Sequence, residues 1–246
     1  MPDARKYAGK RFSILGDSIS TLKGYNPPGY ALFYTGATCK VTGVRTPADT
    51  WWGMVVERLG GELLVNDSWS GCRVTRLPDL LGDFPSGCSD GRTSKLHKDG
   101  VMPDVIIVYL GTNDWGYGAC LRAPADCPKI LENDYFDVAY RLMIGKLRGN
   151  YPDALICCCT LCETYLPADY NFVFPSSLGG THIQDYNDVI REICADPSLS
   201  PAGAVPLKLI DLFSYYTPYA TVDGFHPTAR GMETLADLVV KALTEG

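Results

Sequence analysis

The sequence lacks the features typical of membrane-spanning proteins and of nucleic-acid-binding proteins. None of its apolar runs approaches the length of a membrane-spanning helix, so we expect no membrane span. It has no run rich in Lys or Arg, and its net charge is −6, so we expect no nucleic-acid partner. It also has no internal repeat and no low-complexity segment. With 46% hydrophobic residues, the chain has ample material for a packed core.

Two further absences concern cofactors and targeting. No glycine-rich motif that would hold a phosphate follows the first apolar segment, so we expect no cofactor of the flavin or nucleotide kind, and no other cofactor is indicated. The first residues, from Met1 to Lys6, lack the apolar segment of a secretory signal peptide. This absence leads us to expect a cytoplasmic protein.

Cysteine is abundant, with ten residues, but its spacing is not that of a disulfide framework. Cys157, Cys158 and Cys159 are consecutive in an apolar segment, where a free thiol packs as a small apolar group. Cys159 and Cys162 have C-x-x-C spacing, but no second pair or nearby histidine completes a metal site. We therefore expect free thiols and no metal, which fits a reducing compartment.

Apolar segments alternate with helical patterns along the chain. Continuous apolar character predicts five buried parallel strands, at about 11–16, 62–66, 104–110, 153–160 and 207–211. Amphipathic spacing predicts helices between them, over roughly 49–60, 134–149, 183–195 and 228–243. This alternation predicts a doubly wound sheet with right-handed crossovers. The length of 246 residues favours one α/β domain over residues 1–246.

Two long segments without a regular pattern follow predicted strands. Residues 21–48 and 163–181 are rich in aromatic residues, Gly and Pro. Loops of this length in a compact domain are usually functional. Because ligands of parallel sheets bind outside the carboxyl ends of the strands, we expect both segments to wall a substrate pocket. A third segment, 82–103, is interpreted as a surface crossover.

Polar residues directly follow three of the predicted strands, and the carboxyl ends of parallel strands meet at one edge of a sheet. Ser18 follows the first strand, the turn 66–71 the second and Asn113 the third. Near the C-terminus, Asp223 precedes His226 by three residues. Each of these residues alone has a simpler explanation, because serine and aspartate cap helices and asparagine occupies turns.

Taken in order, the four segments resemble the blocks of the SGNH hydrolases, also called the GDSL esterase/lipase family. The serine, glycine, asparagine and histidine of the family fall at Ser18, Gly71, Asn113 and His226. The first block reads Gly-Asp-Ser-Ile instead of Gly-Asp-Ser-Leu, and Ile19 keeps the apolar character. The resemblance implies a serine esterase with a flavodoxin-like three-layer α/β/α sandwich around a parallel sheet of about five strands.

The expected chemistry is nucleophilic catalysis. Ser18 would attack an acyl carbon, and His226 would accept the serine proton and deliver it to the leaving alcohol. Asp223 would hold the imidazole in the required tautomer. The resemblance implies that the backbone N–H groups of Ser18 and Gly71 and the Asn113 amide form an oxyanion hole. Glycine suits that place because it allows the backbone to approach the substrate closely.

Three aromatic residues flank the segments that carry Gly71 and Asn113. They are Trp69, Trp115 and Tyr117, and they would either bind substrate or pack in the core.

The favoured function is deacetylation of a carbohydrate, or cleavage of another small acyl ester. A lipase, a lysophospholipase or a thioesterase would use the same site. A different class, a non-catalytic ligand-binding protein of flavodoxin-like topology, would have no need for Asp223 and His226.

Overall fold

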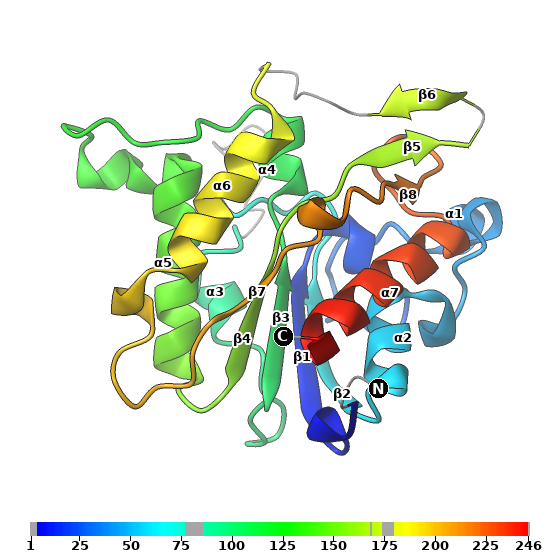
Figure 1. The fold of residues 1–246 in the computed structure, drawn as a ribbon, viewed down its shortest axis with the longest axis horizontal. Coiled ribbons are helices and arrows are strands. Elements are labelled where there is room, and N and C mark those ends of the chain that lie inside the picture. The colour runs from blue at the N-terminus through cyan, green and yellow to red at the C-terminus, as the bar shows by residue number, and fades with distance from the viewer. Residues whose placement is uncertain (1–3, 77–85, 168, 174–179, 246) are drawn as a thin grey trace.

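The computed structural model describes residues 4–76, 86–167, 169–173 and 180–245. Its centre is a parallel five-stranded sheet in the order β2-β1-β3-β4-β7 (Figure 1). The strands are β1 (Arg11–Gly16), β2 (Glu62–Ser68), β3 (Val105–Tyr109), β4 (Leu155–Cys159) and β7 (Lys208–Ile210). The predicted sheet is therefore confirmed, each strand agreeing with its predicted segment to within a few residues.

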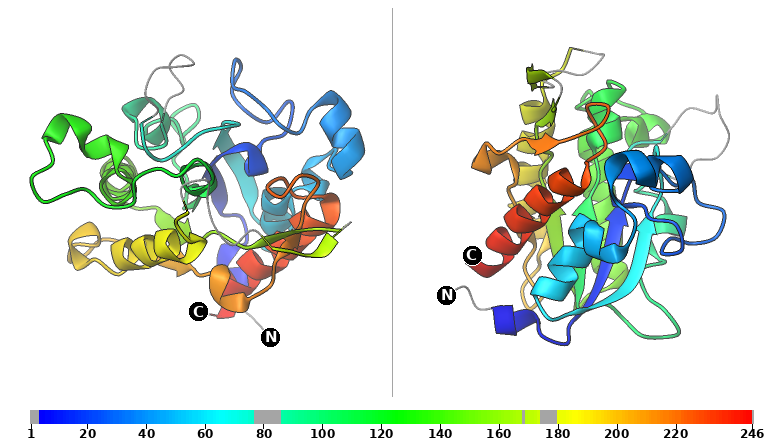
Figure 2. Two further views of the ribbon diagram at one scale, coloured as in Figure 1. Left: turned by 90° about the horizontal axis from the view of Figure 1, so that it is seen from above. Right: turned by 90° about the vertical axis from the view of Figure 1, so that its right-hand side faces the viewer.

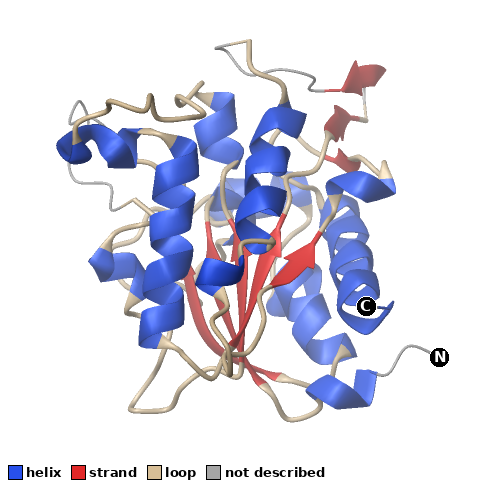
Figure 3. Cartoon of the chain, turned by 60° about the vertical axis from the view of Figure 1, so that its left-hand side comes forward, coloured by secondary structure: helices blue, strands red, loops and turns tan. Residues whose placement is uncertain are grey.

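Helices cover both faces of this sheet (Figures 2 and 3). On one side α2 (Trp51–Arg58) packs against α7 (Ala229–Glu245), and on the other α5 (Phe136–Asn150) packs against α6 (Ile183–Cys194). The shorter helices are α1 (Gly36–Thr42), α3 (Asp90–Thr93) and α4 (Thr112–Gly116). The 3₁₀ helices are η1 (Ala4–Tyr7), η2 (Ser18–Ser20), η3 (Pro47–Asp49), η4 (Lys129–Asp134), η5 (Pro197–Leu199) and η6 (Phe213–Tyr215). The expected three-layer α/β/α arrangement is confirmed.

Local sequence explains where the long helices form and which face they bury. The Thr50 side chain accepts a hydrogen bond from the Gly53 N–H and so caps the start of α2. His182 caps α6 in the same way, through the Gln184 N–H. Helix α7 buries Met232 and Leu235 with other apolar residues at helical spacing against the sheet. Among the described residues, none of the helices combines the length and apolar character needed to cross a membrane.

Several of the cysteines lie in the core of the protein. All ten are free thiols, and Cys157, Cys158 and Cys159 are fully buried on β4. Burial raises the pKa of the Cys157 thiol to about 12, so this side chain stays protonated and serves as apolar packing.

The segments predicted to be irregular contain more structure than expected. Helix α1 lies within 21–48, and β5 (Thr164–Leu166) lies within 163–181. Strand β5 pairs with β6 (Asp169–Val173) and β8 (Tyr219–Ala220) in a second sheet, of order β6-β5-β8. This sheet lies at the end of the molecule toward which the central strands run (Figure 1). Strands of two to five residues are too short to reveal an alternating pattern in the sequence.

Parts of two predicted loops lie outside the described residues, namely 82–85 of the expected crossover 82–103, and residues 168 and 174–179 of 163–181. The described part of the crossover, 86–103, includes α3 and the fully buried Arg92. The interpretation as a surface crossover fits the exposed residues of this part, such as 97–102, but it does not account for the buried ones.

The register of the central strands determines where the candidate site residues emerge. Gly16, at the end of β1, pairs with Ser68 at the end of β2 and with Tyr109 at the end of β3. Three strands therefore end at the same level. The turns that carry Ser18, Gly71 and Asn113 all start from this edge, as the parallel-strand rule predicts.

Candidate active site

Ser18, His226 and Asp223 form a hydrogen-bonded chain at this edge. The Ser18 hydroxyl oxygen lies 2.9 Å from His226 Nε2. The other ring nitrogen, Nδ1, lies 2.6 Å from Asp223 Oδ2. When Nδ1 carries the proton shared with the carboxylate, Nε2 is left to accept the hydroxyl proton of Ser18. The arrangement can therefore pass a proton from a serine to an imidazole.

The turn that carries Asp223 and His226 is held by its own backbone. Its ends are joined by a 3.0 Å hydrogen bond from the Val222 N–H to the His226 carbonyl. Gly224 has a φ of +92°, a conformation that favours glycine. The second carboxylate oxygen, Asp223 Oδ1, accepts the N–H groups of Phe225 (3.0 Å) and His226 (2.8 Å). The aspartate is thereby oriented toward the imidazole from within its own turn.

The same contacts keep Asp223 ionised. Partial burial opposes ionisation, but the hydrogen bonds from the His226 side chain and from the two backbone N–H groups outweigh it. They hold the pKa of the carboxyl group below its ordinary value. Asp223 is therefore a carboxylate at neutral pH, as a group that orients and stabilises an imidazolium must be.

The turn after β1 leaves Ser18 little freedom. A side chain at Gly16 would place its Cβ 2.7 Å from Ser20 Oγ and 2.8 Å from Ser68 Oγ, so only glycine fits there. The Asp17 carboxylate accepts the Ile19 N–H at 3.0 Å and caps η2. Burial, with a smaller effect from nearby Asp114, raises the pKa of Asp17 to about 7. Ser18 is nearly buried at the start of the capped turn, with 6% of its surface exposed.

Gly71 and Asn113 lie beside this turn. Gly71 has a φ of +81°, and a Cβ added to it would meet no atom within 4 Å, so its backbone faces open space. The Asn113 side-chain amide donates to the Cys72 carbonyl at 2.9 Å and to Asp17 Oδ2 at 3.4 Å. Asn113 thus joins the turn after β2 to the turn after β1.

Asp114 has a structural role beside the site. Its buried carboxylate accepts the N–H groups of Val74 (2.8 Å) and Thr75 (2.9 Å), together with the Thr75 hydroxyl. These bonds fasten the chain that follows Gly71 to the start of α4.

A buried arginine, which was not predicted from the sequence, lies beneath the site. Arg92 Nε donates to Asp67 Oδ2 at 2.5 Å, and both side chains are fully buried. The guanidinium also donates to the Gly16 carbonyl (3.2 Å) and to the Cys72 sulfur (2.9 Å). Asp67, which follows the apolar run 63–65 of the second strand, was the only signal for a buried cation, and it does not indicate which residue supplies the cation.

The three predicted aromatic residues have different environments. Trp115 is 2% exposed, and its indole N–H donates to the Thr181 carbonyl, so it packs in the core. Trp69 is half-buried, with its ring centroid 4.0 Å from that of Tyr30. Tyr117 is 67% exposed at the end of α4. Of these residues, Tyr117 and Trp69 have ring surface to offer a substrate.

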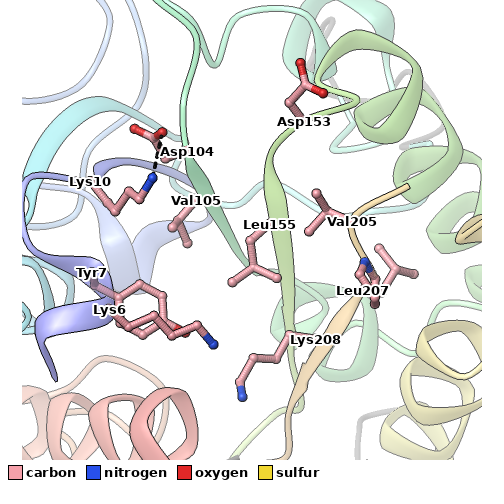
Figure 4. Close-up of a pocket in the computed structure, with 11 residues that line it drawn as sticks. Lys6, Tyr7, Lys10, Asp104, Val105, Asp153, Leu155, Val205, Leu207 and Lys208 are labelled. Carbon is pink, nitrogen blue, oxygen red and sulfur yellow. Dashed lines mark hydrogen bonds and ion pairs between the residues drawn. The ribbon is translucent and has the colours of Figure 1, made fainter. Parts of the chain in front are cut away.

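A cavity of about 500 Å³ lies at the other end of the central sheet (Figure 4). Lys10, beside the start of β1, and Lys208, at the start of β7, are among the residues that line it. Strand β1 runs from this cavity to Ser18, so the cavity is separate from the hydrogen-bonded chain.

A parallel α/β sheet with a serine, a histidine and an aspartate joined at its carboxyl edge is an arrangement found in serine hydrolases. The sequence profile described as GDSL-like Lipase/Acylhydrolase matches residues 10–171 of this chain. The protein belongs to this family and is an ester hydrolase. The expected SGNH/GDSL resemblance is thereby confirmed.

Solved structures share the fold. A protein from Bacteroides ovatus named as a GDSL-like lipase has a TM-score of 0.73 and 23% sequence identity, covering 97% of this chain and all of that one. A second protein named as a GDSL-like lipase, from Bacteroides uniformis, has a TM-score of 0.71 and 25% sequence identity, over 97% of each chain. A family two carbohydrate esterase from Clostridium thermocellum, in complex with cellohexaose, has a TM-score of 0.60 and 19% identity, over 97% of this chain and 65% of that one. No curated protein matches the sequence.

Proposed function

We propose that the enzyme cleaves oxygen esters of small acyl groups, with Ser18 as nucleophile, His226 as general base and Asp223 as the residue that orients His226. The observation that carries this proposal is the continuous chain of hydrogen bonds from Ser18 Oγ to the Asp223 carboxylate. A serine hydroxyl becomes an effective nucleophile only when a base removes its proton during attack. His226 Nε2, 2.9 Å from that hydroxyl, is within reach to do so.

In the first half of the reaction, the Ser18 oxygen bonds to the acyl carbon while its proton moves to His226 Nε2. The carbonyl oxygen becomes an oxyanion, and the tetrahedral intermediate then expels the alcohol, which takes the proton from His226. In the second half, a water molecule attacks the acyl-enzyme with His226 again as base. The acid is released, and the proton returns from His226 to Ser18.

The oxyanion would be held by the backbone N–H groups of Ser18 and Gly71 and by the Asn113 amide. The open space around Gly71 supports this role, because a substrate oxygen can approach its backbone. The longer of the two Asn113 hydrogen bonds, at 3.4 Å to Asp17, is the one that a closer acceptor would replace. Each such donor typically contributes about 3–4 kcal/mol to stabilising the transition state.

For the substrate, we propose an acetyl ester of a carbohydrate. Two observations support this choice. The fold is shared with carbohydrate esterases from Clostridium thermocellum and from Corynascus. In addition, Tyr117 is an exposed aromatic ring four residues after Asn113, and aromatic faces stack on sugar rings.

The test is a series of p-nitrophenyl esters of increasing acyl length, together with acetylated oligosaccharides, with Ser18→Ala as the control. We expect the acetate to be cleaved fastest, and acetyl groups to be released from the oligosaccharides by the wild type alone. A rate that rises with chain length to octanoate, without deacetylation of sugars, would instead indicate an enzyme for long acyl chains, such as a lipase.

A further inference from the structure

The imidazole of His226 has a further contact that the proposed mechanism does not use. The ring of Phe33 is stacked on it, with the two ring centroids 3.5 Å apart and the planes at 5°. Phe33 is half-buried and belongs to the segment 21–48, far from His226 in the sequence. One face of the imidazole is therefore covered by an aromatic ring, while its two nitrogens contact Ser18 and Asp223.

Phe33 is held in this place by the turn that carries the nucleophile. Its N–H donates to Thr21 Oγ1 at 2.9 Å, and the Thr21 hydroxyl donates to the Ser18 carbonyl at 3.0 Å. Thr21 is fully buried. The ring that covers His226 is thus connected through one side chain to the backbone of Ser18.

The next residue, Tyr34, fixes the chain just beyond the imidazole. Its buried hydroxyl donates to the Pro227 carbonyl at 2.9 Å. The rings of Phe33 and Tyr34 meet edge to face, with centroids 5.0 Å apart. Two consecutive residues therefore hold both the ring of His226 and the backbone that follows it.

We infer that Phe33 is a positioning residue that selectively stabilises the protonated form of His226. This inference rests on the proposed role of His226 as the base. Two neutral aromatic rings prefer an offset or edge-to-face arrangement to a face-to-face one. A cation over the face of an aromatic ring is attracted to it. The contact therefore becomes more favourable when His226 takes the proton of Ser18, which is the change that occurs on the way to the transition state.

The experiment has to separate this electrostatic effect from packing. Replacing Phe33 with mono-, di- and trifluorinated phenylalanine nearly preserves the ring's shape and progressively weakens the negative potential of its face. Phe33→Leu removes the flat ring, and Phe33→Tyr restores it. Phe213→Leu is the matched control, because Phe213 also lies near a cation, Arg191, with 5.8 Å from the guanidinium carbon to its ring centroid.

We expect kcat toward p-nitrophenyl acetate to fall stepwise along the fluorinated series, to about 3- to 30-fold below wild type for Phe33→Leu. Phe33→Tyr should restore it, and the melting temperature should change little among the fluorinated variants. Phe213→Leu should keep the wild-type kcat. A kcat that is equal across the fluorinated series and falls only in Phe33→Leu would mean that Phe33 contributes packing alone, and would overturn the inference.

A second measurement does not depend on ester hydrolysis. The protonation of His226 can be followed by NMR in protein with isotope-labelled histidine, since the chain has three histidines. Ionisable groups near its ring include Asp223 on its own turn, Asp17 and Ser18 on the turn after β1, and Tyr34 beside Phe33, and all are retained in these variants.

We expect the midpoint of this titration to move to lower pH in Phe33→Leu and along the fluorinated series, because the protonated ring loses its partner. An unchanged midpoint would overturn the inference. If the wild type hydrolyses no ester, the proposed function fails, while this titration still decides the role of Phe33.

Discussion

Arg92 and Asp67 form an ion pair in which neither side chain has any exposed surface. Removing two charges from water is costly, and additional hydrogen bonds are needed to compensate. Arg92 supplies such bonds by donating to the Gly16 carbonyl and to the Cys72 sulfur. One guanidinium thereby joins the end of β1, two residues before Ser18, to the turn that carries Gly71.

Arg92→Met should destabilise the protein by about 3–5 kcal/mol, because it leaves the buried Asp67 carboxylate without its cation. The double variant Arg92→Met/Asp67→Leu should lose less free energy of unfolding than the sum of the losses in the two single variants. Urea unfolding of the four proteins measures this coupling. Losses that simply add would show that the pair is not coupled.

The variant Asn113→Ala tests whether Asn113 donates to the oxyanion or only stabilises its turn. As an oxyanion donor, Asn113 should contribute roughly 10²–10³ to kcat and little to KM. The melting temperature should fall only modestly, through loss of the bond to the Cys72 carbonyl. A large loss of melting temperature with near-normal kcat would instead identify a turn residue. All three quantities should be measured on one preparation.

Asp223→Asn should keep the fold and lower kcat strongly, by up to about 10⁴ as in serine proteases, because the amide favours the wrong imidazole tautomer. The melting temperature should stay close to wild type, since the side chain is 43% exposed. A variant with unchanged kcat would remove Asp223 from the catalytic machinery.

Asp17→Asn should alter how stability depends on pH. The pKa of Asp17 is raised to about 7 in the folded protein, so the folded state holds this proton more tightly than the unfolded chain, whose pKa is about 3.9. Its contribution to stability is therefore present below about pH 4 and is lost as the pH rises toward 7. Asparagine can still accept the Ile19 N–H but does not ionise.

Relative to wild type, Asp17→Asn should therefore gain stability between pH 4.5 and 7.5, by about 1 kcal/mol or more. Melting curves of both proteins across this range measure the difference. Parallel pH profiles for the two proteins would contradict the account.

The sequence predicted the parts of the molecule that follow periodic rules. Continuous apolar runs located the five central strands, and the rule for parallel sheets brought Ser18 and Asn113 to one edge. The family resemblance added His226, which lies 208 positions from Ser18 in the sequence and 2.9 Å from it in the structure.

The other features of the site depend on individual contacts between segments that show no hydrophobic periodicity. Phe33 lies in a loop with many aromatic residues, and nothing in its neighbours indicates that it contacts His226. Arg92 lies in a stretch rich in Gly, Ser and Asp, a composition typical of exposed chain. Trp115 was as compatible with packing as with binding, and only its 2% exposure distinguishes the two.

The most direct test of the account is covalent labelling of the protein with a fluorophosphonate, followed by peptide mapping. We predict one adduct per chain, on Ser18, with loss of ester hydrolysis in step with labelling, and neither labelling nor hydrolysis in Ser18→Ala. Labelling that persists in folded Ser18→Ala, or an adduct on another residue, would contradict the assignment of Ser18 as the nucleophile.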